Sequence, residues 1–135
     1  MQQIAIAPFG PNGETEIAVV RTPHIGGIDQ FYRMEVGKLS LVAPEAGGYM
    51  SYVIRSRNLD QVVAGGFAGD GNVEFVVPSR DQMRLTGLRC VSDGIEEVWS
   101  LELESRLSSN LSIVSLDGGR LTLAVGTANG SLYVW

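Results

Sequence analysis

The most reactive side chains in this chain are those of one histidine, His24, and one cysteine, Cys90. A thiol nucleophile needs a base within reach, and His24 lies far away along the sequence. A histidine metal site needs companion ligands at short spacing, and none surround His24, which we expect to be a solvated loop residue. Cys90 lies two residues after Leu88 in an alternating apolar run, so we expect a buried core thiol. We therefore assign no catalytic residue.

Arginine is the main source of positive charge, because Lys38 is the only lysine. A guanidinium suits two-point contact with a carboxylate or a phosphate. Arg55 and Arg57 are two residues apart, so a strand would place them on one face, where we expect them to pair with nearby acids. The net charge of −5 repels polyphosphate, so we expect neither nucleic acid nor an anionic membrane as a partner.

The glycine-rich segment 66–71 has the composition of a phosphate-binding loop. A dinucleotide fingerprint must open a helix, whereas residues 74–77, Glu-Phe-Val-Val, predict a strand. The segment also lacks the Gly-Lys-Ser/Thr sequence of a phosphate-binding P-loop. We therefore do not interpret it as a phosphate site.

The elements that carry these residues have a hydrophobic period of two, which predicts strands. Asn-Gly and Asp-Gly pairs between the apolar runs supply the residues that tight hairpins require. A helix over residues 95–107 is the one competing interpretation. The twelve predicted strands are residues 3–7, 16–21, 28–35, 39–43, 49–55, 61–65, 74–77, 83–90, 97–103, 111–115, 121–126 and 131–135.

The composition of the 135 residues agrees with an all-β chain. With 44% hydrophobic and 19% charged residues and 17 glycines, it excludes a disordered acidic tail and disfavours a helical bundle. The single cysteine cannot form an internal disulfide. We find neither a signal-peptide pattern nor an apolar run of about 20 residues that would span a membrane.

Two segments of the chain resemble each other closely enough to indicate an internal repeat. Residues 3–20 align without gaps on residues 61–78, which places Glu16 on Glu74. Propeller blades recur at about 40–50 residues, and the interval from Glu16 to Glu74 is longer, so it predicts an insertion of about ten.

A third, shorter copy covers residues 111–126. Thr122 takes the place of Glu74 in this copy, at an interval that falls within the usual range for a blade. The repeats predict an all-β fold of about three four-stranded antiparallel propeller blades. The blades would cover about residues 1–47, 48–105 and 106–135, and the last would be incomplete.

Residues 66–77, Gly-Phe-Ala-Gly-Asp-Gly-Asn-Val-Glu-Phe-Val-Val, resemble the loop and second strand of an FG-GAP/VCBS-type propeller blade. Residues 8–16 show the same pattern less fully, and residues 123–135 also resemble blades of the WD40 and PQQ types. FG-GAP-type loops can hold calcium through Asp and Asn oxygens. The resemblance therefore implies two weak calcium candidates, Asp70 and Glu74, which are too few for a strong site because calcium takes six to eight oxygen ligands.

The function that we expect is a non-enzymatic binding or scaffolding module. It would recognise a protein or a glycan through loops on one propeller face. The alternative is a partial enzyme or cofactor-binding propeller whose active site needs missing blades or a second subunit. Three blades leave two blade faces uncovered, so we also expect either further blades or self-association, in which two copies would give six blades.

Overall fold

The computed structural model describes residues 2–22, 27–42, 46–116 and 121–135. All the strands and bridges among these residues form antiparallel pairs, in three sheets of five, four and three strands, and no helix occurs within them. The prediction of an all-β chain is therefore confirmed.

Each sheet is built from strands that follow one another in the chain and lie next to one another in the sheet, with β5 as an additional partner of β3. The first sheet contains β1 (Gln2–Ala7), β2 (Glu16–Arg21), β3 (Gly27–Glu35), β4 (Lys38–Leu41) and β5 (Ala46–Tyr49). The second contains β6 (Val63–Gly65), β7 (Glu74–Pro78), β8 (Arg84–Val91) and β9 (Gly94–Glu102). The third contains β10 (Ser112–Ser115), β11 (Leu121–Gly126) and β12 (Leu132–Val134).

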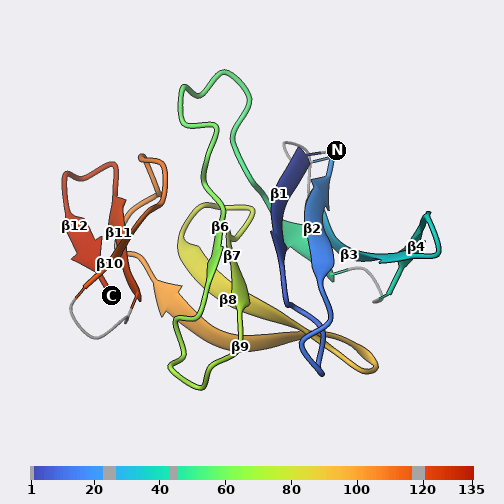
Figure 1. Cartoon of the computed structure of the whole chain (residues 1–135). Helices are drawn as coiled ribbons and strands as arrows, with labels where there is room; N and C mark the ends of the chain where they lie inside the picture. Colours follow the sequence, from blue (N-terminus) through green and yellow to red (C-terminus); the bar gives the residue numbers. More distant parts are fainter. Residues whose placement is uncertain (1, 23–26, 43–45, 117–120) are drawn as a thin grey trace.

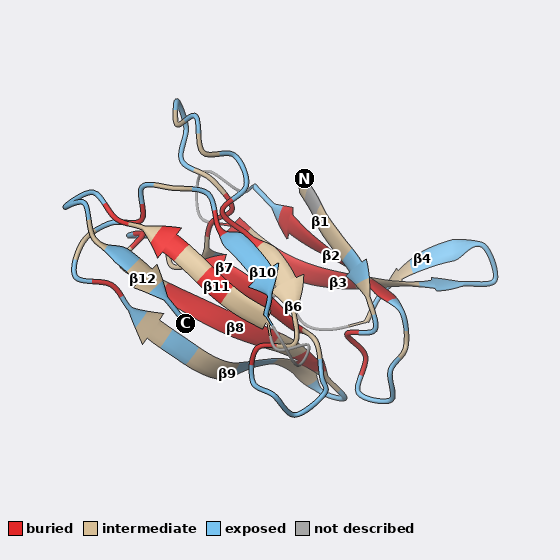
Figure 2. Cartoon of the chain, turned by 60° about the vertical axis from the view of Figure 1, so that its left-hand side comes forward, coloured by how far each residue is buried: buried red, intermediate tan, exposed pale blue. Residues whose placement is uncertain are grey.

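The second sheet lies between the other two (Figure 1). Its strand β7 is buried along its whole length, because it faces a hydrophobic cluster on each side (Figure 2). Phe75 and Val77 pack with Ala18 and Phe31 of the first sheet, whereas Val76 packs with side chains of the third sheet. Alternate residues of a strand point to opposite faces, so this one strand contributes to both cores.

The end of β5 in the first sheet lies against the turn between β7 and β8 of the second sheet. Tyr49 forms an isolated bridge with Ser79, and the backbone N–H of Arg80 donates to Gly48 O at 2.9 Å. These contacts tie the end of one sheet to a turn of the next.

The segment that follows the second sheet makes the same contacts with the third. Leu107 forms an isolated bridge with Thr127, and the N–H of Ala128 donates to Arg106 O at 2.8 Å. Leu107 follows Tyr49 at the interval that separates the first two copies of the repeat in the sequence. Thr127 likewise follows Ser79 at the interval that separates the second copy from the third.

Most of the strand predictions agree with the structure, and residues 49–55 are the main error. Strand β5 ends at Tyr49, and residues 50–55 form an irregular connection in which Arg55 has a left-handed φ of 68°. Met50 leaves the first sheet because its N–H donates to Pro78 O in the second sheet. Arg55 and Arg57 are consequently exposed in this connection and do not share a strand face.

The remaining predictions that involve local structure have clear outcomes. Strand β9 continues to Glu102, so the helix considered for residues 95–107 does not form. The glycines of three predicted turns, Gly13, Gly71 and Gly130, have positive φ, as their Asn-Gly and Asp-Gly pairs predicted. The turn at 117–118 lies outside the described residues.

Candidate ligand-binding site

Two buried glutamates mark equivalent places at the starts of β2 and β7. Glu16 accepts a hydrogen bond from Arg33 Nη2 at 2.5 Å, and Glu74 accepts one from Arg89 Nη2 at 2.6 Å. Neither glutamate side chain is accessible to solvent, and each partner arginine lies on the next strand. These ion pairs hold the strands β2 and β3, and β7 and β8, together at one end of each sheet.

The structure brings together the two calcium candidates, Asp70 and Glu74, but an arginine lies between them. Arg89 Nη2 is 2.9 Å from Asp70 Oδ2 and 2.6 Å from Glu74 Oε1. The other oxygen of Glu74 accepts the backbone N–H groups of Phe67 and Ala68. The guanidinium and the loop backbone therefore already satisfy these carboxylates, and a calcium ion would have to displace Arg89.

The other residues considered for chemistry lie apart. No group of three or more His, Cys, Asp or Glu side chains that could hold a metal occurs among the described residues. Cys90 is buried, and burial together with the nearby Glu16 carboxylate raises the pKa of its thiol to about 12, so the thiol stays protonated and unreactive. His24 lies outside the described residues.

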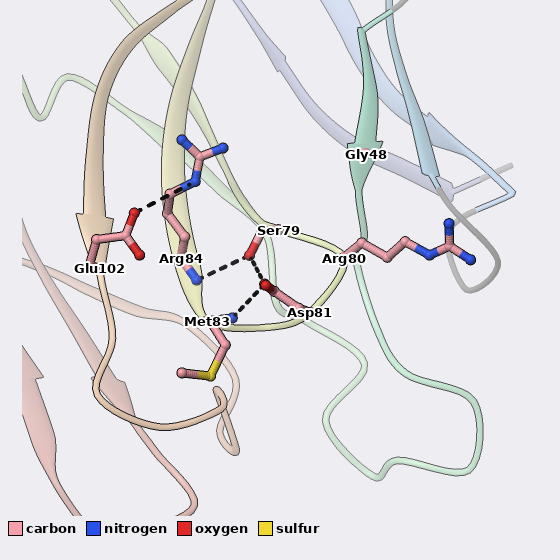
Figure 3. A pocket seen from close by; sticks show the side chains of 7 residues that line it. All are labelled: Gly48, Ser79, Arg80, Asp81, Met83, Arg84 and Glu102. Carbon is pink, nitrogen blue, oxygen red and sulfur yellow. Dashed lines mark hydrogen bonds and ion pairs between the residues drawn. The ribbon is translucent and has the colours of Figure 1, made fainter.

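A shallow surface hollow of about 670 Å³ lies beside the turn between β7 and β8. Residues of the first sheet, the turn and the far edge of the second sheet line this hollow (Figure 3). Its lining consists of Gly48, Ser79, Arg80, Asp81, Met83, Arg84 and Glu102.

The turn that forms the floor of the hollow is held by its own side chains. Asp81 Oδ1 accepts the Ser79 hydroxyl at 2.6 Å and the Met83 N–H at 3.0 Å. These hydrogen bonds, from the hydroxyl first, lower the pKa of Asp81, so its carboxylate stays ionised at neutral pH. Gln82 adopts a positive φ of 63°, and its N–H closes the turn on Ser79 O at 2.9 Å. The turn is therefore ordered without a ligand.

The two arginines that line the hollow differ in their partners. Arg84 Nη1 is 2.8 Å from Glu97 Oε1, and its Nε is 4.0 Å from Glu102. Arg80 is exposed and has no ion-pair partner among the described residues. In Figure 3 its side chain points away from Arg84 and Glu102, towards the side where β5 lies. Among the described residues that line the hollow, Arg80 is thus the cation without an ion-pair partner, and its guanidinium is available to a ligand on the β5 side of the hollow.

Sequence reasoning missed this site, since it selected Arg55 and Arg57 rather than Arg80. One available signal was the Ser79-Arg80-Asp81 sequence, which follows the predicted strand 74–77 after a single proline. Ser and Asp at that spacing predict a side-chain-closed turn, which leaves the intervening residue pointing outward. The contribution of Gly48 could not be read from the sequence, because it depends on the crossing between the two sheets.

No protein-family model matches the chain, and no curated protein matches it. None of the described residues forms a helix that is long and apolar enough to cross a membrane.

Proposed function

We propose that this chain is a non-enzymatic binding module of tandem propeller-type blades. Its ligand would carry a carboxylate, as an acidic side chain of a protein or as an acidic sugar. The observation that carries the proposal is the exposed Arg80 guanidinium, without an ionic partner in the described residues, at a hollow between two sheets.

The chemistry of the hollow supports a carboxylate ligand. A free guanidinium presents a planar fork of N–H donors that matches a carboxylate, and charge-assisted bonds of this kind are stronger than neutral ones. Met83 adds apolar surface beside the charges. The acidic groups nearby, Asp81 and Glu102, limit how many carboxylates the hollow can accept, so we expect recognition of one acidic group rather than of a polyanion.

The tandem-blade part of the proposal is supported by the contacts that recur between sheets. The bridges Tyr49–Ser79 and Leu107–Thr127 are equivalent, and so are the ion pairs Glu16–Arg33 and Glu74–Arg89. The second sheet consists of four consecutive antiparallel strands, and the first contains four such strands with β5 as an additional partner of β3; four consecutive antiparallel strands are the strand order of a propeller blade. The likeness to FG-GAP-type blades rests on the loop sequences and remains part of the proposal.

A binding experiment with defined probes tests the proposed function. Arrays of peptides with single Asp or Glu residues, and of glycans with uronic or sialic acids, are compared with their neutral counterparts. We expect acidic probes to bind, and Arg80→Ala to weaken this binding roughly 10- to 100-fold, the value of one charged hydrogen-bonding group. Arg80→Lys keeps the charge but loses the fork, so it should restore only part of the affinity.

Arg57→Ala is the matched control, because Arg57 is also an exposed arginine but does not line the hollow. It should bind the acidic probes as well as the original chain does. If acidic probes bind no better than neutral ones, or if Arg80→Ala and Arg57→Ala weaken binding equally, the proposed site is wrong. The peptide and glycan arms of the arrays separate the two sources of carboxylate.

A further inference from the structure

The first sheet has an apolar face that points away from the second sheet. The strand register aligns Ile6, Ile17, Tyr32 and Leu41 in one row across four strands. This row lies on the face opposite to Ala18, which packs towards the second sheet. Val19 and Gln30, the next pair on this face, are buried, whereas Ile6 is 59% exposed and Leu41 is 47% exposed, so the face is uncovered at the end that carries Ile6 and Leu41.

The hairpin of β3 and β4 extends this face beyond the body of the molecule (Figure 2). Met34 and Leu39 are directly opposite each other in the register, on the same face as Tyr32, and are 59% and 54% exposed. Their equivalents in the second sheet are Cys90 and Ile95, which also form a cross-strand pair directly after the ion-paired arginine.

Unlike those of Met34 and Leu39, the side chains of Cys90 and Ile95 are covered by a neighbouring sheet. Both pack into the cluster shared with the first sheet, and Cys90 is only 2% exposed. The exposed face of the first sheet therefore corresponds to the face of the second sheet that packs against the first sheet.

The third sheet has a free face of the opposite kind. Leu132 and Val134 are 71% and 63% exposed, and the register places Val134 beside Ala124. Ala124 lies two residues after Thr122, as Val76 lies two residues after Glu74, and Val76 packs towards the third sheet. The free face of the third sheet thus corresponds to the face of the second sheet that packs against the next sheet along the chain, the third.

We propose that the third sheet of one copy of this chain docks on the first sheet of a second copy, head to tail. This inference rests on the tandem-blade part of the proposed function. A second copy fits because each chain carries one free face on its first sheet and one on its third sheet. If the third sheet of each copy packs on the first sheet of the other, all four faces are covered. Two such interfaces close a ring of six sheets, within the usual range for propellers.

The charges at the two faces agree with this pairing. Within one chain, the first and second sheets each pack one face against the next sheet along the chain, and these faces bury Glu16 and Glu74 with their arginines. In the third sheet Thr122 occupies that position, so docking buries no carboxylate there that would need a partner. On the first sheet of the other copy, the hairpin residue that corresponds to Cys90 is Met34, which is uncharged.

The native mass of the whole chain, measured by light scattering over a range of concentrations, tests the inference. We expect a dimer. Met34→Asp places a charge on the free face of the first sheet, and Leu132→Asp places one on the free face of the third, so each variant alone should have the mass of a monomer. Mixing the two variants should restore a dimer, because one of its interfaces then joins two unaltered faces.

Val53→Asp is the matched control, because Val53 is an exposed apolar residue in the connection between sheets and lies on neither free face. It should remain a dimer, and unchanged circular dichroism should show that all three variants are folded. A monomeric original chain would overturn the inference. It would also be overturned if either folded variant, Met34→Asp or Leu132→Asp, stays dimeric by itself, since a symmetric contact between identical faces would leave one of the two variants dimeric. A mixture of the two variants that stays monomeric would overturn it as well. Ligand binding at Arg80 is measured separately, so a failed dimer and a failed binding site are distinguishable.

Discussion

The first and second sheets bury the same ion pair but satisfy it differently. In the second sheet both oxygens of Glu74 have partners, because Oε1 accepts Arg89 and Oε2 accepts the N–H groups of Phe67 and Ala68. In the first sheet Arg33 donates to Glu16 Oε1, while Glu16 Oε2 is buried without a hydrogen-bond partner among the described residues.

The difference shows that Glu16 and Glu74, which occupy corresponding positions in the two sheets, stabilise different contacts. Glu74 ties the loop 66–73 to the core, since it binds that loop's backbone as well as the neighbouring strand. The corresponding loop 8–15 closes on itself, because Gly10 donates its N–H to Glu14 O and the Glu14 carboxylate accepts from Asn12. Glutamates at corresponding places in two sheets therefore need not contribute equally to stability.

The largest predicted effect comes from removing these glutamates. Glu74→Ala leaves Arg89 without its buried partner and also removes the acceptor of two backbone N–H groups, so we expect a loss of about 3–5 kcal/mol in the free energy of unfolding. Glu16→Ala should cost about 1–3 kcal/mol less, because no backbone donor depends on Glu16. Urea unfolding of both variants measures the difference. An equal or larger loss for Glu16→Ala would contradict this account.

A second contrast involves the residue four positions before each arginine, which is Asp29 in the first sheet and Leu85 in the second. Both are fully buried. Neither carboxylate oxygen of Asp29 has a hydrogen-bond partner in the described part of the chain, and burial raises the pKa of Asp29 to about 8. A group that would be charged in water thus occupies a position where the second sheet has an aliphatic side chain.

Asp29 should make the stability of the chain depend on pH. In the unfolded chain this carboxyl ionises near its ordinary pKa of 3.8, whereas in the folded chain it stays protonated up to about pH 8. The unfolded state therefore binds fewer protons over this window. Asp29 consequently lowers stability by about 1.4 kcal/mol for each unit that the pH rises within it.

Asp29→Asn tests this expectation, because the amide resembles the protonated carboxyl but does not titrate. Relative to the original chain, the variant should gain stability steadily as the pH rises from about 4 to about 8. Denaturant unfolding across that range gives the comparison, with Asp93→Asn as a control at an exposed turn of the second sheet. If the difference between Asp29→Asn and the original chain does not change with pH, Asp29 is ionised in the fold.

A third contrast lies two residues before each arginine, where the first sheet has Phe31 and the second has Gly87. A Cβ atom added at Gly87 would lie against the indole ring of Trp99, closer than real Cβ atoms approach other atoms. Trp99 cannot move freely, because its ring contacts Phe67 and Trp135, at centroid distances of 6.2 and 4.1 Å. Trp99 therefore fills at Gly87 the space that Phe31 fills in the first sheet.

Gly87→Ala should consequently destabilise the chain by about 1–3 kcal/mol through overpacking. Gly126→Ala in the third sheet is the control, since its added Cβ would meet Ser109 at 3.5 Å, an ordinary contact. Thermal unfolding and tryptophan fluorescence report both the stability and the displacement of Trp99. A variant at Gly87 that unfolds like the one at Gly126, with unchanged fluorescence, would contradict the packing role of the glycine.

These contrasts also show how much the sequence could predict. Alternation located most of the strands, because a run such as 16–21 carries its own period, and Asn-Gly or Asp-Gly pairs such as residues 12–13 marked some of the turns between them. The path of residues 50–55 depends on a hydrogen bond from Met50 to a distant strand, and the candidate site depends on Gly48 meeting the turn at Arg80. Contacts between segments that are distant in the chain leave no local pattern, so those features could not be predicted.

The smallest expected effect concerns the tight turn of Val36 and Gly37 between β3 and β4, where the second sheet has the turn of Ser92 and Asp93 between β8 and β9. Val36 is fully exposed at this tip and has a left-handed φ of 48°, which is unfavourable for a β-branched residue. Val36→Asn should raise the free energy of unfolding by about 0.5–1 kcal/mol, because Asn tolerates that conformation. Val53→Asn, at an exposed valine without positive φ, should change it little. If both variants shift the urea midpoint equally, the strain at Val36 is not what limits this turn.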